Sequence, residues 1–177
     1  MNRSGWIVVG LLVAIFAVGT EQGGAARAAS PAWKGAETLN PLSLAPAPLR
    51  CGPPPTYLEG RFAGSGLDSV GGAFTVTASG CLDTEKLRLF DMEATDTFVS
   101  SGDSIVILPG DVDLVLNADT CVAVNRRPVP FRTGSATGSL QGASGQGTFH
   151  IALSYPPCGG ALLPAHVWFD GTLHVPR

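Results

Sequence analysis

The chain has 177 residues, of which 45% are hydrophobic, 7% aromatic and 14% charged, and it contains 23 Gly and 14 Pro. This composition is too apolar for an intrinsically disordered protein and lacks the strict glycine period of collagen. A net charge of −3 supplies no basic surface for nucleic acid, so we expect no nucleic-acid partner, and the length is that of one domain.

The first 28 residues have the features of a cleaved signal peptide. Arg3 supplies a positive charge, an apolar run extends from Trp6 to Val18, and Ala26-Arg27-Ala28 matches the small-residue cleavage pattern. The apolar run is too short to span a bilayer as a mature helix. We therefore expect cleavage after Ala28, a secreted or periplasmic protein, and no membrane span after cleavage. A retained membrane anchor is the alternative.

Residues 29–55 form a Pro-rich lead-in that includes the run Pro53-Pro54-Pro55. Because Pro cannot donate a backbone hydrogen bond to a sheet, we predict that no central strand lies here. The predicted domain organisation is therefore a signal peptide at 1–28, a lead-in at 29–55 and one β-barrel domain at 56–177.

Beyond the lead-in, short β-rich runs are separated by Gly, Asp and Pro, and no stretch has the 3.6-residue period of a helix. Apolar and polar residues alternate in several runs, which is typical of half-buried antiparallel strands. A phase change in one run predicts a β-bulge near Leu89–Phe90. The predicted strands are 57–64, 71–79, 85–98, 103–109, 111–117, 120–125, 128–133, 146–155 and 166–175. We predict an all-β chain that forms a single antiparallel β-barrel of about eight strands, with a β-sandwich as the alternative.

The four cysteines, Cys51, Cys81, Cys121 and Cys158, lie in the exported part of the chain. An even number in an oxidising compartment predicts two disulfides. A hairpin that turns near Asp68 would bring Cys51 beside Cys81, and the strands that flank a later glycine segment would bring Cys121 beside Cys158. The alternative joins Cys81 to Cys121 and Cys51 to Cys158. The spacings do not resemble a zinc module, so we expect no metal.

That glycine segment, residues 133–149, has the sequence TGSATGSLQGASGQGTF. Gly permits positive φ angles and close approach of two backbones, as at a sharp corner of a barrel. A flexible linker is the alternative. The β-rich runs on both sides favour an ordered segment.

Part of the segment resembles a known signature, G-T-G-x-F-x-G-A-x-G-x-G-x-F, which occurs in secreted bacterial β proteins that are uncharacterised. It is also similar to the glycine segment of plant dirigent proteins and allene oxide cyclases. The resemblance implies an eight-stranded antiparallel barrel, often oligomeric, so a homo-oligomer is an open expectation. It aligns no catalytic residue of those families. The positions that carry it are Gly138, Leu140, Gly142, Ala143, Gly145, Gly147 and Phe149.

Histidine, tryptophan and aspartate gather on the last two predicted strands. His166, Trp168 and Asp170 share one face of 166–175, and His150 would neighbour them if the two strands pair. An aromatic surface with His and Asp could bind a small polar ligand or act in acid–base chemistry. These four residues are the candidate ligand-binding set, and an outer sheet face is the alternative. We assign no catalytic residue.

Acidic residues are frequent in the middle of the chain, and their oxygens could hold Ca²⁺. Because no EF-hand spacing occurs and solvated strand faces are usually polar, we expect no metal and no cofactor. Glu59 and Arg61 lie on one strand face and predict a surface ion pair of little energetic value. The acidic set is Asp91, Glu93, Asp96, Asp103, Asp111, Asp113 and Asp119.

Two functional hypotheses follow. The first is a secreted β-barrel without catalytic activity, with a binding or envelope-associated role. The second is a barrel like the allene oxide cyclases and dirigent proteins, which acts on a small apolar molecule. The second hypothesis requires an open, partly polar cavity inside the barrel, so the state of the interior distinguishes the two.

Overall fold

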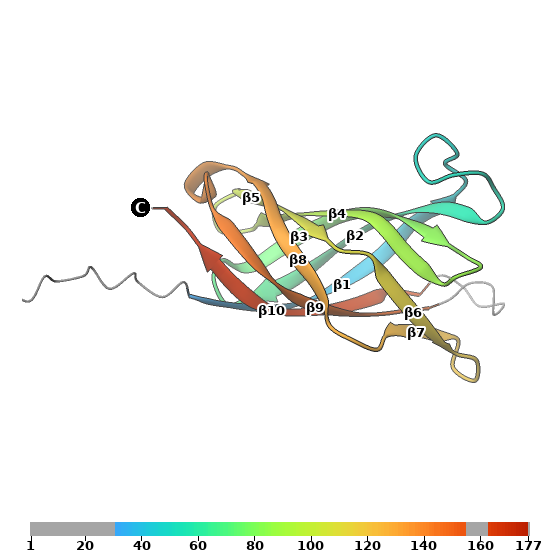
Figure 1. The fold of residues 1–177 in the computed structure, drawn as a ribbon. Coiled ribbons are helices and arrows are strands. Elements are labelled where there is room, and N and C mark those ends of the chain that lie inside the picture. The colour runs from blue at the N-terminus through green and yellow to red at the C-terminus, as the bar shows by residue number, and fades with distance from the viewer. Residues whose placement is uncertain (1–30, 155–162, 177) are drawn as a thin grey trace, which may run out of the picture.

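The computed structural model describes residues 31–154 and 163–176, so the predicted signal peptide and Cys158 lie outside the described residues. The described chain is all-β and forms a closed antiparallel barrel, as predicted (Figure 1). In its described part, no helix is long and apolar enough to cross a membrane. The elements are β1 (Ala32–Ala45), β2 (Tyr57–Asp68), β3 (Gly72–Asp83), β4 (Arg88–Phe98), β5 (Ser104–Pro109), β6 (Val112–Asn117), β7 (Val122–Asn125), β8 (Val129–Ala136), the short 3-10 helix η1 (Gly138–Leu140), β9 (Ser144–Ser154) and β10 (Ala165–His174).

Most strands that follow one another in the sequence pair with one another, except that β5 does not pair with β6 and β7 does not pair with β8. β1 closes the ring by pairing with β10. β4 pairs with β6 near its start and with β5 near its end, while β9 pairs first with β8 and then with β7. β5–β6 and β7–β8 therefore act as two bent strands, which gives eight positions around the barrel. All nine strands predicted beyond the lead-in are present, with ends that differ by a few residues.

The prediction that residues 29–55 hold no central strand is wrong. β1 occupies Ala32–Ala45 and pairs with β2 on one side and β10 on the other. Pairing with β10 ends at Leu39, and the register on β2 shifts between Pro41 and Ser43. Pro41 therefore lies at a bulge, where β1 has one described neighbour, so its missing N–H costs little.

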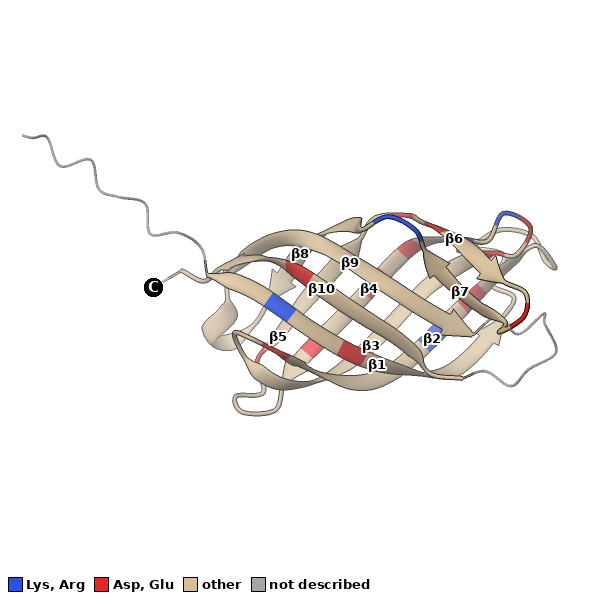
Figure 2. Cartoon of the chain, turned by 90° about the horizontal axis from the view of Figure 1, so that it is seen from below, with Lys and Arg blue, Asp and Glu red and all other residues tan. Residues whose placement is uncertain are grey.

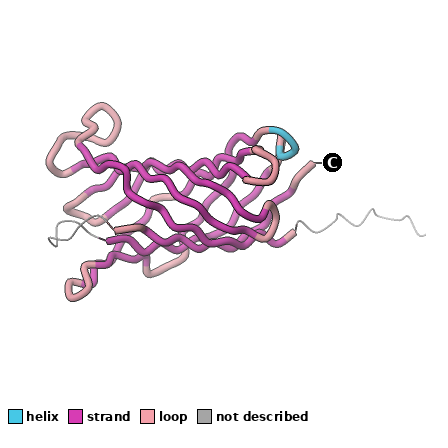
Figure 3. Tube along the Cα trace, turned by 180° about the vertical axis from the view of Figure 1, so that it is seen from behind, coloured by secondary structure: helices cyan, strands magenta, loops and turns pink. Residues whose placement is uncertain are grey.

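The barrel has two ends. At the floor end β1 begins and β10 ends, and at the mouth end β1 finishes and is followed by the 46–56 loop. Figure 3 shows loops gathered at both ends of the strand wall. Charged positions are sparse along that wall (Figure 2).

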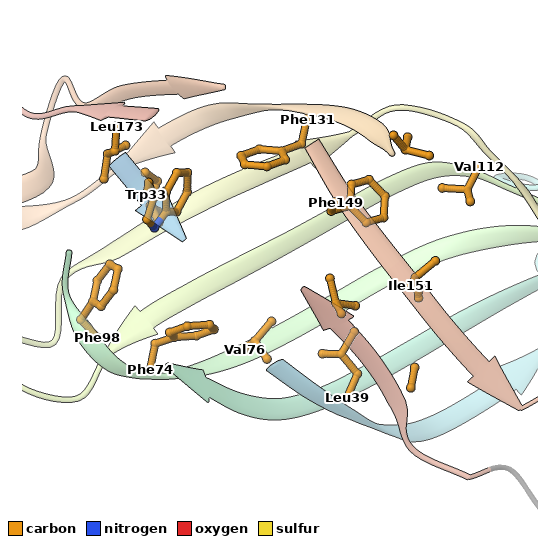
Figure 4. Packing of buried hydrophobic residues seen from close by; sticks show 14 of the residues in the cluster. Trp33, Leu39, Phe74, Val76, Phe98, Val112, Phe131, Phe149, Ile151 and Leu173 are labelled. Atoms are coloured by element: carbon orange, nitrogen blue, oxygen red, sulfur yellow. The ribbon is translucent and has the colours of Figure 1, made fainter. Parts of the chain in front are cut away.

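Aromatic rings fill the floor end (Figure 4). The centroid of the Trp33 ring lies 5.6 Å from that of Phe131 and 5.3 Å from that of Phe169, both in edge-on contact. Phe74 and Phe98 form a second edge-on pair at 6.1 Å. The Trp33 indole N–H donates to the Asp68 carboxylate at 2.8 Å, which satisfies its polar atom inside the core.

The glycine segment is ordered, as predicted. Its central part contains η1, and its last residues open β9. A Cβ on Gly147 would lie 2.4 Å from the carbonyl oxygen of Asp170 and 2.7 Å from the Cα of Gly171. Gly147 and Gly171 are register partners. Glycine is therefore required at this close approach of β9 and β10.

A disulfide links the 46–56 loop to β3 at the mouth end, on the outer side of the barrel wall. Cys51 and Cys81 are bonded, with their Cα atoms 5.4 Å apart, so this predicted pairing is confirmed. Beside Cys81 the register between β3 and β4 shifts: Ser79 pairs with Glu93, but Cys81 pairs with Phe90. The extra residue is a bulge in β4, which lies next to the predicted bulge position. Since Cys158 lies outside the described residues, its pairing with Cys121 stays a prediction.

Arg50 holds the same loop to the barrel wall. Its guanidinium lies 2.6 Å from a Glu59 carboxylate oxygen and 2.8 Å from an Asp91 oxygen. The expected ion pair between Glu59 and Arg61 is also present, at 3.2 Å. The Arg50 contacts lower the pKa of Glu59 and keep it ionised.

Candidate functional site in the barrel interior

The four residues proposed from the sequence lie together on the outer wall. Trp168 is the register partner of His150, as expected, and their rings stack with centroids 5.6 Å apart. His166 contacts the Thr38 hydroxyl at 3.2 Å, and Asp170 pairs with Lys34 at 2.8 Å. Trp168 is 47% exposed. Ligand binding at this outer surface stays a prediction.

A cavity of about 130 Å³ lies inside the barrel, on the other side of the wall. It extends from the aromatic floor, at Trp33, Phe131 and Phe169, towards the mouth, where Leu82 and Leu163 line it. Leu163 is 60% exposed, so the cavity reaches the surface there. An eight-stranded barrel has room for filling side chains or for one small ligand. A cavity of about this volume accepts a benzene-sized ring in other proteins.

Small residues keep the interior open. Ala78 on β3 and Ala94 on β4 are register partners, and both line the cavity. Gly80 lines it next to them, where a Cβ would lie 2.8 Å from the Met92 side chain. Larger side chains at these positions would fill the space that the cavity occupies.

Two carboxyl groups project into this mostly apolar interior, Glu37 from β1 and Asp96 from β4. Glu37 alternates in phase with Trp33 and Leu39, which are buried. Its partner on β2 is Gly66, where a Cβ would lie 2.9 Å from the Glu37 Cβ. A missing side chain on the neighbouring strand therefore makes room for the carboxyl group.

Asp96 is more deeply buried, with 2% of its surface exposed. Its register partners are Val76 on β3 and Ile105 on β5, both of which are buried and apolar. Its Oδ1 has no hydrogen-bond partner among the described residues. An unpaired buried polar atom costs about 1–3 kcal/mol, so this oxygen is expected to acquire a donor when one is available.

The burial of the two groups changes their titration. Removal from water raises the pKa of Asp96 to about 8, with smaller contributions from the negative charges of Glu37 and Asp68. Burial alone raises the pKa of Glu37 to about 7. Asp96 is therefore mostly protonated at pH 7, and Glu37 is divided between its two forms.

Sequence analysis missed this pair for two different reasons. Glu37 lies in β1, which was not predicted. Asp96 was grouped with acidic residues that lie on the outside, such as Asp111, which pairs with Arg88 at 2.6 Å. The available signal was phase, because Asp96 alternates with Phe98, whereas its acidic neighbours do not. Among the described residues, no cluster of three or more His, Cys, Asp or Glu could hold a metal.

No protein-family model matches the chain, and neither a curated protein nor a solved structure is significantly similar to it.

Proposed function

We propose that this protein binds a small, mainly apolar molecule inside its barrel. The observation that carries the proposal is the combination of an open apolar cavity with one buried carboxyl oxygen that lacks a partner. Apolar walls supply affinity, and a few polar groups fix the orientation of a ligand. The glycine segment, which resembles that of the dirigent and allene oxide cyclase barrels, adds support to this proposal.

A catalytic role on a similar molecule is the second candidate. It is favoured by Asp96, because a carboxylic acid that stays protonated near pH 7 can donate a proton to a substrate. Binding is the simpler proposal, because a catalytic role would also require that the molecule binds in the cavity.

The proposal includes an exported location. The Cys51–Cys81 disulfide is compatible with an oxidising compartment, which is where such bonds persist. Mass spectrometry of protein recovered from the exported fraction is expected to find an N-terminus near Ala29. An exported protein that retains Met1 would contradict the predicted cleavage.

Binding can be tested by titrating benzyl alcohol into the protein and following amide chemical shifts by NMR. We expect saturable shifts at residues that line the cavity. The variant Ala94→Leu adds bulk inside the lumen and is expected to weaken binding at least tenfold. Ala73→Leu is the matched control, because Ala73 is exposed on the outer face of β3 and does not line the cavity.

Two results would contradict the proposal. One is the absence of saturable shifts with benzyl alcohol, toluene and benzylamine alike. The other is equal affinity in Ala94→Leu and Ala73→Leu, which would place the bound probe elsewhere on the protein.

A further inference from the structure

The ionisable groups of the lumen all have the same sign. Glu37 and Asp96 lie within it, whereas Glu93 is exposed on the outer face of β4. No Lys, Arg or His is present among the described residues that line the cavity. A ligand that carries a carboxylate would therefore meet repulsion and find no counter-charge.

The unpaired oxygen of Asp96 requires a donor. A neutral hydroxyl can donate one hydrogen bond to it, whereas an ammonium group can donate three and also supplies the missing positive charge. Hydrogen bonds between charged groups are about twice as strong as those between neutral ones. An ammonium group near Asp96 would also be attracted by Glu37, since the two carboxyl groups are close enough for one charge to raise the proton affinity of the other.

We propose that the lumen selects ligands with a protonated amine on a small apolar body, with the ammonium group held by Asp96 and Glu37 and the apolar body against the walls. This inference rests on the proposed binding function and specifies the chemical class of its ligand. The aromatic residues of the floor, Trp33 and Phe169, offer ring surfaces to the same cation.

Binding of a cation is linked to proton release. Below about pH 7 the two carboxyl groups carry protons, and an incoming ammonium group favours their ionised forms, so a proton leaves to solvent as each ion pair forms. The charged groups around Asp96 are Glu37 from β1 and Asp68 from β2, while Glu93 of its own strand is exposed on the outer face. The partners on β3 and β5 are apolar. Affinity for an amine is therefore expected to rise from pH 6 to pH 8.5.

The experiment compares three probes of nearly the same shape: benzylamine, benzyl alcohol and benzoate. Isothermal titration calorimetry at pH 8 is expected to give at least a tenfold higher affinity for benzylamine than for benzyl alcohol, and no measurable binding of benzoate. At pH 6, titrations in two buffers of different ionisation enthalpy are expected to show net release of a proton with benzylamine and none with benzyl alcohol.

Two variants distinguish the lumen from the protein's overall negative charge. Asp96→Asn keeps the shape of the side chain and is expected to reduce the preference for benzylamine to less than threefold while benzyl alcohol still binds. Asp113→Asn removes an equal charge from a side chain that is 90% exposed and is expected to leave the preference unchanged. Glu37→Gln is expected to lower the preference by a smaller factor than Asp96→Asn.

The outcomes separate this inference from the proposed function. Equal affinity for benzylamine and benzyl alcohol would overturn the amine preference and leave lumenal binding intact. A preference that survives in Asp96→Asn would also overturn it. If none of the probes binds, both the function and the inference fail.

Discussion

The floor and the mouth of the barrel are built from the same strands but are stabilised differently. The floor is filled by interlocking aromatic rings, among them Trp33 and Phe131. The mouth half contains the cavity and is fastened from outside by the Cys51–Cys81 disulfide and by Arg50. The comparison indicates that a barrel end with an open interior can be stabilised by contacts on the outer side of its wall.

The largest difference between the two halves is expected from removal of core side chains. Phe74 is 1% exposed in the floor, so Phe74→Ala should lower the free energy of unfolding by about 3–5 kcal/mol through the cavity that it leaves. Met92 borders the existing cavity and is partly exposed, so Met92→Ala should cost about 2 kcal/mol, the lower end of the range for such truncations. Urea unfolding followed by Trp fluorescence measures both variants. Equal costs would mean that the halves are packed alike.

Removal of the disulfide tests the outside fastening. The bond joins residues 30 apart in the sequence, and the double variant Cys51→Ser, Cys81→Ser is expected to lose roughly 2–4 kcal/mol of stability. Amide exchange should accelerate at the mouth more than at the floor. Uniform acceleration along all strands would show that the bond stabilises the whole barrel and has no particular role at the mouth.

The glycine segment tests how closely the strands approach at the floor end. A Cβ on Gly145 would lie 2.8 Å from the carbonyl oxygen of Thr172, so Gly145→Val is expected to cost roughly 1–3 kcal/mol in chemical unfolding. Gln146→Val is the control, because Gln146 is the exposed neighbour on the same strand, and it should change stability by less than about 0.5 kcal/mol. Equal effects would contradict a requirement for glycine.

The last expected effect depends on pH. Because folding raises the pKa of Asp96 to about 8, the folded protein retains a proton that the unfolded chain loses near pH 4, and this group lowers stability as pH rises between those values. Asp96→Asn cannot ionise, so the stability that it gains over the wild type should be larger at pH 8 than at pH 5. Thermal melts at the two pH values measure it, and a variant that is less stable at pH 8 would contradict the prediction.

Alternation along the sequence was sufficient to predict nine strands, the all-β class and the Cys51–Cys81 pair. It failed at β1, because the rule against Pro in a central strand assumes that both neighbours extend past the Pro. Pairing of β1 with β10 stops at Leu39, before Pro41. That end point is a property of the assembled barrel and is not visible in the local pattern.

The site was less predictable than the fold. Alternation separates the two faces of a strand, and on β10 it correctly grouped Trp168 with Asp170. The local pattern drew attention to these polar and aromatic residues, which the closed barrel places outside. Glu37 and Asp96 are single carboxyl groups in apolar phases of two strands, and their proximity depends on closure of the ring.

Closure of that ring has a consequence for folding. Ala32 is the register partner of Thr172, so the contacts that close the ring join segments 140 residues apart in the sequence. Contacts over such separations slow folding, because the chain between them must first be ordered. Until β10 is in place, the edges of β1 and β9 are exposed and can recruit strands from other molecules. Truncation before β10 should therefore yield a chain that aggregates, because this last strand covers the edges of both β1 and β9.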